Sequence, residues 1–250
     1  MNWDRNLRLG ETEYVGLIDP AHAHETPFGT FYAHPEFPDR YDASQLCRVR
    51  CGPDATDGLL AHLEELYEPL GLAYRKVSGA DPAVWAHLGP ELEARGWMVA
   101  RDALLLFTGT PTYKGNQELT IRAVGPDSRD LAGLYTNDRE LDRGFQLARS
   151  QFARVGGEYL VGHLEGRPAC CCGWFPAGGL VRFRHVLTAP WARGRGCATR
   201  LIRHVQDHPE VRERDGLVIL VSAEGPRPLY EALGFRVEGW FWQARLRPDL

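Results

Sequence analysis

Apolar residues along the first half of the chain follow two spacings, one typical of strands and one typical of helices. Short apolar runs predict strands at 45–50, 72–77 and 103–107. Between them, apolar residues three and four positions apart predict two helices, one beginning at Asp54 or Thr56 and one beginning at Asp81. The order of elements is therefore strand, helix, strand, helix, strand.

The second half repeats this order after residues 109–117, whose Gly, Pro and Asn content is typical of an exposed linker. The strands are expected at 119–124, 159–164, 167–175, 181–188, 216–222 and 237–246, and the helices at about 127–155, 198–205 and 228–233. Each half also contains the pentapeptide Glu-Ala-x-Gly-aromatic between a short helix and a strand, at 93–97 and 231–235. An internal repeat indicates that each copy is a structural unit of its own. We therefore predict two similar domains, at 1–110 and 118–250.

The turn between the strand at 181–188 and the next helix is unusually bare and positively charged. Residues 193–196 read Arg-Gly-Arg-Gly. A helix start presents free N–H groups and the positive end of its dipole, and glycines remove the side chains that would keep an anion away. The turn therefore favours a pyrophosphate, although its spacing fits neither the P-loop nor the dinucleotide pattern. The matching turn of the first half, 53–58, has no such run.

Two motifs in the second half carry a family resemblance. The first is Val-Leu-Thr-Ala-Pro at 186–190 followed by Arg-Gly-Arg-Gly-Cys-Ala at 193–198, and the second is Leu-Tyr-Glu-Ala-Leu-Gly-Phe at 229–235. Together they resemble the signatures of the GNAT superfamily of acetyl-CoA dependent N-acetyltransferases. The resemblance covers 118–250 well, and it covers the first half only as a degenerate copy of the later elements. It implies an α/β fold with a mixed, mostly antiparallel sheet flanked by helices, and a degenerate GNAT-like domain without a coenzyme site at the amino terminus.

The resemblance also implies acetyl-CoA as cosubstrate, without a metal. In this family the strand before the loop splays from its neighbour, binds the pantetheine arm and offers an amide to the thioester oxygen, while the phosphates rest on the loop amides. Ser222 stands where the family often has an asparagine. The residues so assigned are Val186, Leu187, Thr188, Arg193, Gly194, Arg195, Gly196, Cys197, Ala198, Thr199 and Ser222.

The resemblance implies a general acid at Tyr230, which would protonate the leaving thiolate; a half-buried helix residue is the alternative. The base is less clear from the sequence. Where many relatives have a glutamate on the strand before the loop, Arg182 or its neighbours stand here, so that assignment does not carry over. His185 and Glu224 are candidates, and a proton relay through water stays equally open.

The predicted reaction is direct transfer of an acetyl group from acetyl-CoA to a primary amine, without a covalent enzyme intermediate. A small-molecule amine is the first choice of acceptor. A peptide amino terminus or a lysine is the second choice, and a coenzyme A sensor without turnover is the hypothesis from another class.

Composition narrows the class of protein. The net charge is -4 and 25% of the residues are charged, which does not favour nucleic-acid binding. No apolar run is long enough to cross a bilayer and the amino terminus lacks a secretory pattern, so a cytoplasmic protein without membrane contact is expected. The aromatic residues at 240–242 are expected in the core or at a dimer surface, which leaves a homodimer open.

The cysteines and histidines invite other chemistry. The six cysteines have no spacing typical of disulfides or zinc, and three adjacent ones at 170–172 alternate between faces of a strand. We expect them to be reduced and buried. His22, His24 and His34 lie in predicted loops, and ordinary loop residues are favoured there over metal ligands.

Overall fold

The computed structural model describes residues 3–38, 40, 43–107, 114–125, 127–135, 152, 154–223 and 225–246. The chain divides into two compact units, one of Met1–Ala103 with Gly239–Leu250 and one of Leu104–Glu238. Two strands, β5 (Met98–Phe107) and β11 (Phe235–Leu246), contribute residues to both units. The domain boundaries predicted from the sequence, 1–110 and 118–250, stay a prediction.

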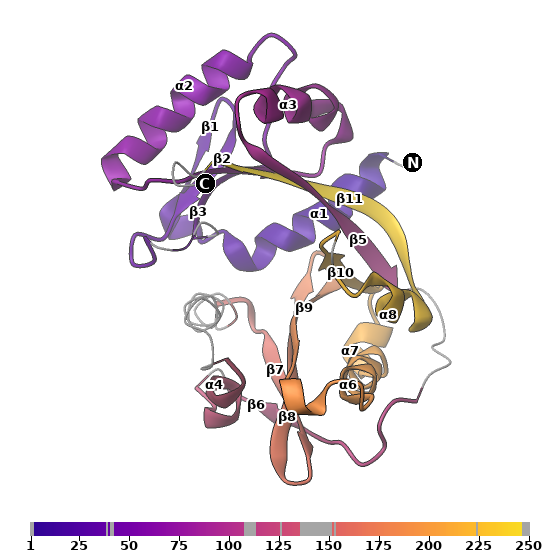
Figure 1. Cartoon of the computed structure of the whole chain (residues 1–250). Helices are drawn as coiled ribbons and strands as arrows, with labels where there is room; N and C mark the ends of the chain where they lie inside the picture. Colours follow the sequence, from indigo (N-terminus) through magenta and orange to yellow (C-terminus); the bar gives the residue numbers. More distant parts are fainter. Residues whose placement is uncertain are drawn as a thin grey trace. The chain divides into compact units, whose positions relative to one another are not determined.

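The first unit contains a sheet in the order β1, β2, β3, β4, β11, β5 (Figure 1). Its remaining strands are β1 (Ala23–Thr26), β2 (Gly29–Ala33), β3 (Ser44–Cys47) and β4 (Arg75–Gly79). The pairs β1–β2, β2–β3 and β4–β11 are antiparallel, whereas β3 and β4 are parallel. The parallel pairing of β3 and β4 requires a crossover, which helix α2 provides.

Two helices, α2 (Thr56–Tyr67) and α3 (Pro82–Ala94), cover one face of this sheet. Asp81 begins α3 as predicted, since its Oδ1 accepts a hydrogen bond from the Ala83 amide at 2.9 Å and proline follows at the first position. The apolar stripes of both helices are fully buried against the sheet, which confirms the two predicted helices. The stripes consist of Leu59, Leu63, Tyr67, Trp85, Leu88 and Leu92.

Helix α1 (Trp3–Leu17) covers the other face of the sheet and was not predicted. It buries polar side chains there, including Asn6 and Glu13. Asn6 Oδ1 accepts a hydrogen bond from the Trp240 amide at 2.6 Å, and Asn6 Nδ2 donates to the Trp240 carbonyl at 3.1 Å. The helix is therefore held by polar bonds to strand backbone as well as by apolar contact. Two short 3-10 helices, η1 (Pro20–His22) and η2 (Glu68–Leu70), complete the unit.

The second unit contains the order β5, β10, β9, β8, β7, β6. Its strands are β6 (Thr120–Val124), β7 (Glu158–Leu164), β8 (Arg167–Ala177), β9 (Leu180–Thr188) and β10 (Leu217–Val221). The pairs β6–β7, β7–β8 and β8–β9 are antiparallel and β9–β10 is parallel. The strands predicted from the sequence are present, with ends that shift by a few residues.

The helices of the second unit lie on both sides of its sheet (Figure 1). They are α4 (Arg129–Tyr135), η3 (Pro190–Ala192), α6 (Cys197–Gln206), α7 (Pro209–Arg212) and α8 (Arg227–Ala232). The predicted helix at 127–155 begins as α4, and residues 136–151 lie outside the described residues. Helix α6 packs against β8 and β9 and buries Leu201, Ile202 and Val205, which fixes its first turn beside the end of β9.

The predicted fold class is confirmed: the chain is an α/β protein with a mixed, mostly antiparallel sheet flanked by helices. Of the helices that the structure describes, none combines the length and the apolar character needed to span a membrane.

Candidate functional site

The glycine-rich turn leads from β9 into helix α6. After η3, Arg193 is extended, and both Gly194 and Gly196 have φ 73°, in the left-handed region that favours glycine. Gly196 is the residue before the first helical turn, and within the described part of the chain no side chain caps the amides of that turn. A turn without side chains at its glycines therefore leads into a helix, as the sequence predicted, and its N–H groups lie at the positive end of the helix dipole.

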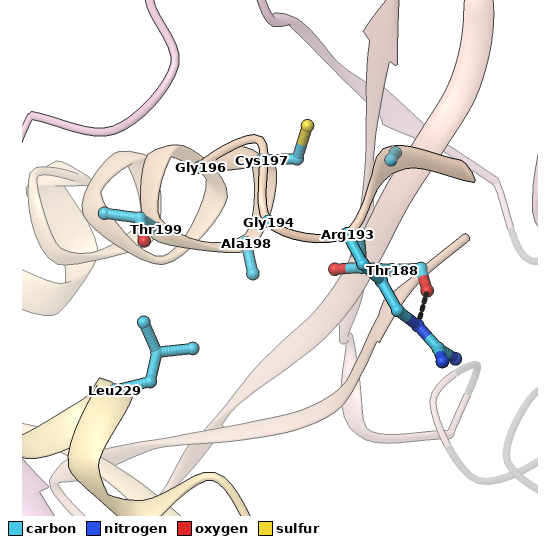
Figure 2. Close-up of a pocket in the computed structure, with 9 residues that line it drawn as sticks. Thr188, Arg193, Gly194, Gly196, Cys197, Ala198, Thr199 and Leu229 are labelled. Carbon is cyan, nitrogen blue, oxygen red and sulfur yellow. Dashed lines mark hydrogen bonds between the residues drawn. The ribbon is translucent and has the colours of Figure 1, made fainter. Parts of the chain in front are cut away.

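A cavity of about 320 Å³ opens at this helix start (Figure 2). Its lining consists of Thr188, Ala192, Arg193, Gly194, Gly196, Cys197, Ala198, Thr199 and Leu229. A Cβ placed on Gly194 would meet no atom within 4 Å. The turn therefore leaves open space over its own backbone, and this space suits a phosphate group that approaches the amides.

The strands β9 and β10 separate beside the cavity. Their pairing runs from Val181–Leu217 to Phe183–Ile219, and in the described part of the chain Arg184, Leu187 and Thr188 of β9 pair only with β8. The Ala189 amide donates to the Ala169 carbonyl of β8 at 2.8 Å, so by strand alternation the backbone groups of Thr188 face the open side. Arg193 Nε donates to the Thr188 carbonyl there at 3.3 Å. This side of β9 has the splayed geometry expected for residues 186–188.

Arg182 lies at the point where the strands separate. Its side chain is only 2% exposed, and its Nη1 donates to the carbonyls of Phe183 at 2.7 Å and Val218 at 3.2 Å, one on each strand. A guanidinium has no lone pair to accept a proton. Arg182 therefore bridges the separating strands and cannot act as the base.

His185 occupies a β-bulge of β9. The β8–β9 register shifts between Cys171 and Gly173, and His185 has φ 55°, which is strained for a residue with a side chain. Its ring lies against Phe152 and Tyr159, with centroids 5.3 and 6.1 Å apart, and its Nδ1 is 3.2 Å from Tyr159 Oη. Burial and the nearby Arg184 and Arg182 lower the pKa of His185 well below its usual 6.5. The imidazole is therefore neutral at neutral pH.

Tyr230 belongs to helix α8, next to Leu229 of the cavity lining. It is 4% exposed, and its ring meets Phe235 edge to face at 5.7 Å. Burial raises the pKa of the Tyr230 hydroxyl above its usual 10, with a smaller contribution from Cys172, and Arg182 opposes the shift. The phenol therefore stays protonated at neutral pH. Its general-acid role stays a prediction.

The predicted residues Thr188, Arg193, Gly194, Gly196, Cys197, Ala198 and Thr199 meet around the cavity, and the other predicted coenzyme residues lie outside its lining. Val186 and Leu187 lie on the splayed strand end. The Arg195 guanidinium donates to Glu165 Oε1 at 2.5 Å, and this bond lowers the pKa of Glu165. Ser222 is exposed after β10, and Glu224 lies outside the described residues.

The cysteines are buried, as the sequence predicted. Burial raises the pKa of Cys170 to about 12 and also raises the pKa of Cys172 and Cys197. These thiols therefore stay protonated and are poor nucleophiles. Among the described residues, no three His, Cys, Asp or Glu side chains come together to hold a metal ion.

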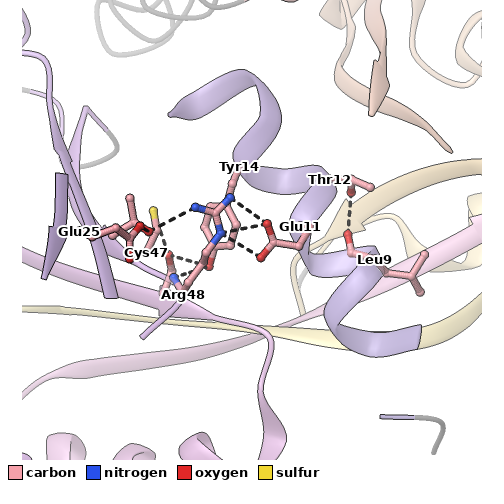
Figure 3. Close-up of polar contacts among 9 residues, drawn as sticks. Leu9, Glu11, Thr12, Tyr14, Glu25, Cys47 and Arg48 are labelled. Carbon is pink, nitrogen blue, oxygen red and sulfur yellow. Dashed lines mark hydrogen bonds and ion pairs between the residues drawn. The ribbon is translucent and has the colours of Figure 1, made fainter. Parts of the chain in front are cut away.

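The first unit has a different arrangement at the matching strand end (Figure 3). Arg48, directly after β3, has φ 52°, and its amide donates to Tyr14 Oη of α1 at 3.2 Å. Its guanidinium binds both carboxylate oxygens of Glu11, at 2.8 to 3.0 Å. Helix α1 therefore binds the backbone amide that follows β3. In the second unit, the corresponding end of β9 is splayed from β10. That the first half lacks a coenzyme site stays a prediction.

Sequence reasoning did not identify Leu229, Ala192, Tyr159 or Asn116 as neighbours of the site. Leu229 precedes the tyrosine of a motif already noted, whereas the side chains of Tyr159 and Asn116 come from segments without a motif. Only their positions in the fold bring them to the turn and to His185.

The comparisons with known proteins agree with this geometry. The family model described as acetyltransferase (GNAT) domain matches residues 155–237. No curated protein matches the chain. The matched segment includes β7 to β10, the glycine-rich turn and the tyrosine helix α8.

Solved structures share the fold over most of the chain. A GCN5-related N-acetyltransferase from Kribbella flavida is 15% identical, with 98% of this chain and 96% of that chain covered and a TM-score of 0.70. A functionally unknown conserved protein from Staphylococcus epidermidis is 12% identical, with 89% and 92% covered and a TM-score of 0.70. A GCN5-related N-acetyltransferase from Sphaerobacter thermophilus is 18% identical, with 78% and 70% covered and a TM-score of 0.57.

Proposed function

We propose that this chain transfers an acetyl group from acetyl-CoA to a primary amine of a small molecule by direct attack, because its residues 155–237 match the model of the acetyltransferase (GNAT) domain. The observation that carries the proposal is the bare turn at the start of α6, with a cavity of about 320 Å³ over its amides, beside a splayed strand end. Acetyl-CoA would supply the activated acetyl group, and the residues of this chain would bind and orient it.

The turn would hold the diphosphate. The uncapped first amides of α6 and the positive φ of Gly194 and Gly196 present N–H groups without side chains in the way. Arg193 is exposed at the cavity and adds positive charge. Residues 186–188 would receive the pantetheine arm along the open side of β9, where an amide can stabilise negative charge that develops on the thioester oxygen.

Tyr230 would act as the general acid. A leaving thiolate needs a proton, and a phenol with a raised pKa carries that proton throughout the neutral range. Its place beside Leu229 on α8 supports this role, because Leu229 lines the cavity.

His185 would act as the base. An amine must be neutral before it attacks, and the neutral imidazole of His185 has a ring nitrogen lone pair that can accept a proton. His185 Nδ1 lies 3.2 Å from Tyr159 Oη, and this contact orients the ring. The strained φ of His185 is consistent with a functional position.

The test is thiol release from acetyl-CoA in the presence of a panel of small primary amines, peptides with free amino termini, and lysine peptides. We expect release that depends on one class of small amine. The net charge of -4 mildly favours cationic amines, because it steers them toward the protein. Tight coenzyme A binding without turnover across the panel would favour a sensor instead, and release with peptides alone would move the acceptor to the second class.

A further inference from the structure

A segment that precedes β6 forms hydrogen bonds with carbonyl groups of the glycine-rich turn. Asn116 Nδ2 donates to the Arg195 carbonyl at 3.0 Å, and the Asn116 amide donates to the Gly196 carbonyl at 3.1 Å. The two bonds join residues far apart in the chain. Asn116 therefore holds two consecutive carbonyls of the turn.

Holding the Arg195 carbonyl fixes the direction of one amide of the turn. In a trans peptide the C=O and the following N–H point in opposite directions across one rigid plane. The plane of the Arg195 carbonyl carries the Gly196 N–H, and the plane of the Gly196 carbonyl carries the Cys197 N–H. The Gly196 carbonyl also accepts the Arg200 amide of α6 at 3.1 Å, so the helix itself sets the direction of the Cys197 N–H. The Arg195 carbonyl is directed to Asn116, so the Gly196 N–H points away from Asn116.

Gly196 lines the cavity, so its amide is one that the proposed diphosphate would meet. We propose that Asn116 is a positioning residue for the diphosphate, which orients the Gly196 amide before the coenzyme arrives. This inference rests on the proposed function and adds a residue from outside the matched domain segment. Pre-orientation lowers the ordering that binding would otherwise require.

The backbone around Asn116 lies very close to the backbone of the turn and of α6. Gly115 has φ 66°, and a Cβ there would lie 2.5 Å from the Arg200 amide nitrogen of α6. A Cβ on Gly196 would lie 3.2 Å from the Asn116 amide nitrogen. Asn116 Oδ1 accepts a hydrogen bond from the Glu118 amide at 2.9 Å, which fixes the side chain with Nδ2 toward Arg195.

The experiment compares N116A and N116S with the control Q117A. N116A removes the donor, and N116S keeps a hydroxyl that can accept from Glu118 but is one bond shorter than the amide. Gln117 carries the same amide group, but its Nε2 donates to the carbonyls of Lys114 and Gly115 in its own segment. The measurements are the coenzyme A Kd by calorimetry, the KM for acetyl-CoA, the KM for the amine, kcat and Tm.

We expect both Asn116 variants to raise the coenzyme A Kd and the KM for acetyl-CoA about threefold to tenfold, the loss of one hydrogen bond and its orientation. The kcat, the KM for the amine and all values of Q117A should stay within about twofold of wild type. A coenzyme A Kd of N116A within about twofold of wild type would overturn the inference. An equal loss of coenzyme A affinity in Q117A, or a fall in kcat of N116A without a change in Kd, would also overturn it. A wild-type protein that does not bind coenzyme A would instead refute the proposed function, and the inference with it.

Discussion

Replacing Tyr230 with phenylalanine separates a catalytic hydroxyl from a structural one. The ring is 4% exposed and packs on Phe235, and phenylalanine keeps that contact. No described residue forms a hydrogen bond with the Tyr230 hydroxyl. Since removal of the hydroxyl leaves no partner unsatisfied, the free energy of unfolding should change by less than about 1 kcal/mol.

The effect on catalysis should be much larger. A positioned general acid contributes about 10²-fold or more to the rate, and about 10²-fold corresponds to roughly 2.7 kcal/mol of transition-state stabilisation. We therefore expect kcat of Y230F to fall at least about 10²-fold while the coenzyme A Kd stays unchanged. The assay is steady-state thiol release together with calorimetry on the same preparations.

The control is Y74F in the first unit. The Tyr74 hydroxyl donates to the Arg40 carbonyl at 2.6 Å, so its loss should destabilise the protein by about 1 kcal/mol and leave kcat unchanged. A Y230F protein with wild-type kcat would refute the general-acid assignment. A large loss of stability in Y230F would show that the hydroxyl has a partner and is structural.

Three further predictions concern the turn, the base and the first unit. G194A should weaken coenzyme A binding more than G178A does. Both glycines have positive φ, 73° and 56°, and open space around a Cβ, so backbone strain of about 1–2 kcal/mol is common to both variants. Equal coenzyme A Kd values by calorimetry would contradict diphosphate binding at the glycine-rich turn. His185 has a lowered pKa, so below pH 6.5 the unfolded chain takes up a proton that the folded protein does not. As the pH falls, wild type should therefore lose up to about 1.4 kcal/mol more unfolding free energy per pH unit than H185N, in which asparagine tolerates the left-handed φ. An equal loss of unfolding free energy in the two proteins between pH 7 and pH 5.5, measured by denaturation, would contradict the lowered pKa. Y14F should cost about 1–2 kcal/mol of stability, because the Arg48 amide loses its acceptor, and should leave the coenzyme A Kd unchanged; a weakened Kd would mean that the first unit takes part in binding.

The sequence was most informative where local chemistry and backbone conformation coincide. Gly194 and Gly196 are glycines because the turn needs positive φ, and that need is visible as a motif. The stripes of α2 and α3 are apolar because they face the core, so periodicity predicts them. In both cases a single segment contains the whole signal.

Other features depend on partners that the sequence does not announce. Helix α1 was missed because it buries polar residues such as Asn6 and Glu13 against strand backbone, so its stripe does not look apolar. Gly10 within it appears unfavourable for a helix, yet a Cβ there would lie 2.2 Å from Ala80 Cβ. The sequence around Asn116 is typical of a linker, because its bonds to Arg195 and Gly196 exist only in the folded unit.

The central claim is that backbone amides of the glycine-rich turn bind a diphosphate, and a crystal structure with coenzyme A tests it most directly. We expect phosphate oxygens within hydrogen-bonding distance, about 2.7–3.2 Å, of amide nitrogens between Gly194 and Ala198. A coenzyme whose phosphates lie elsewhere, with these amides bound to water, would contradict it.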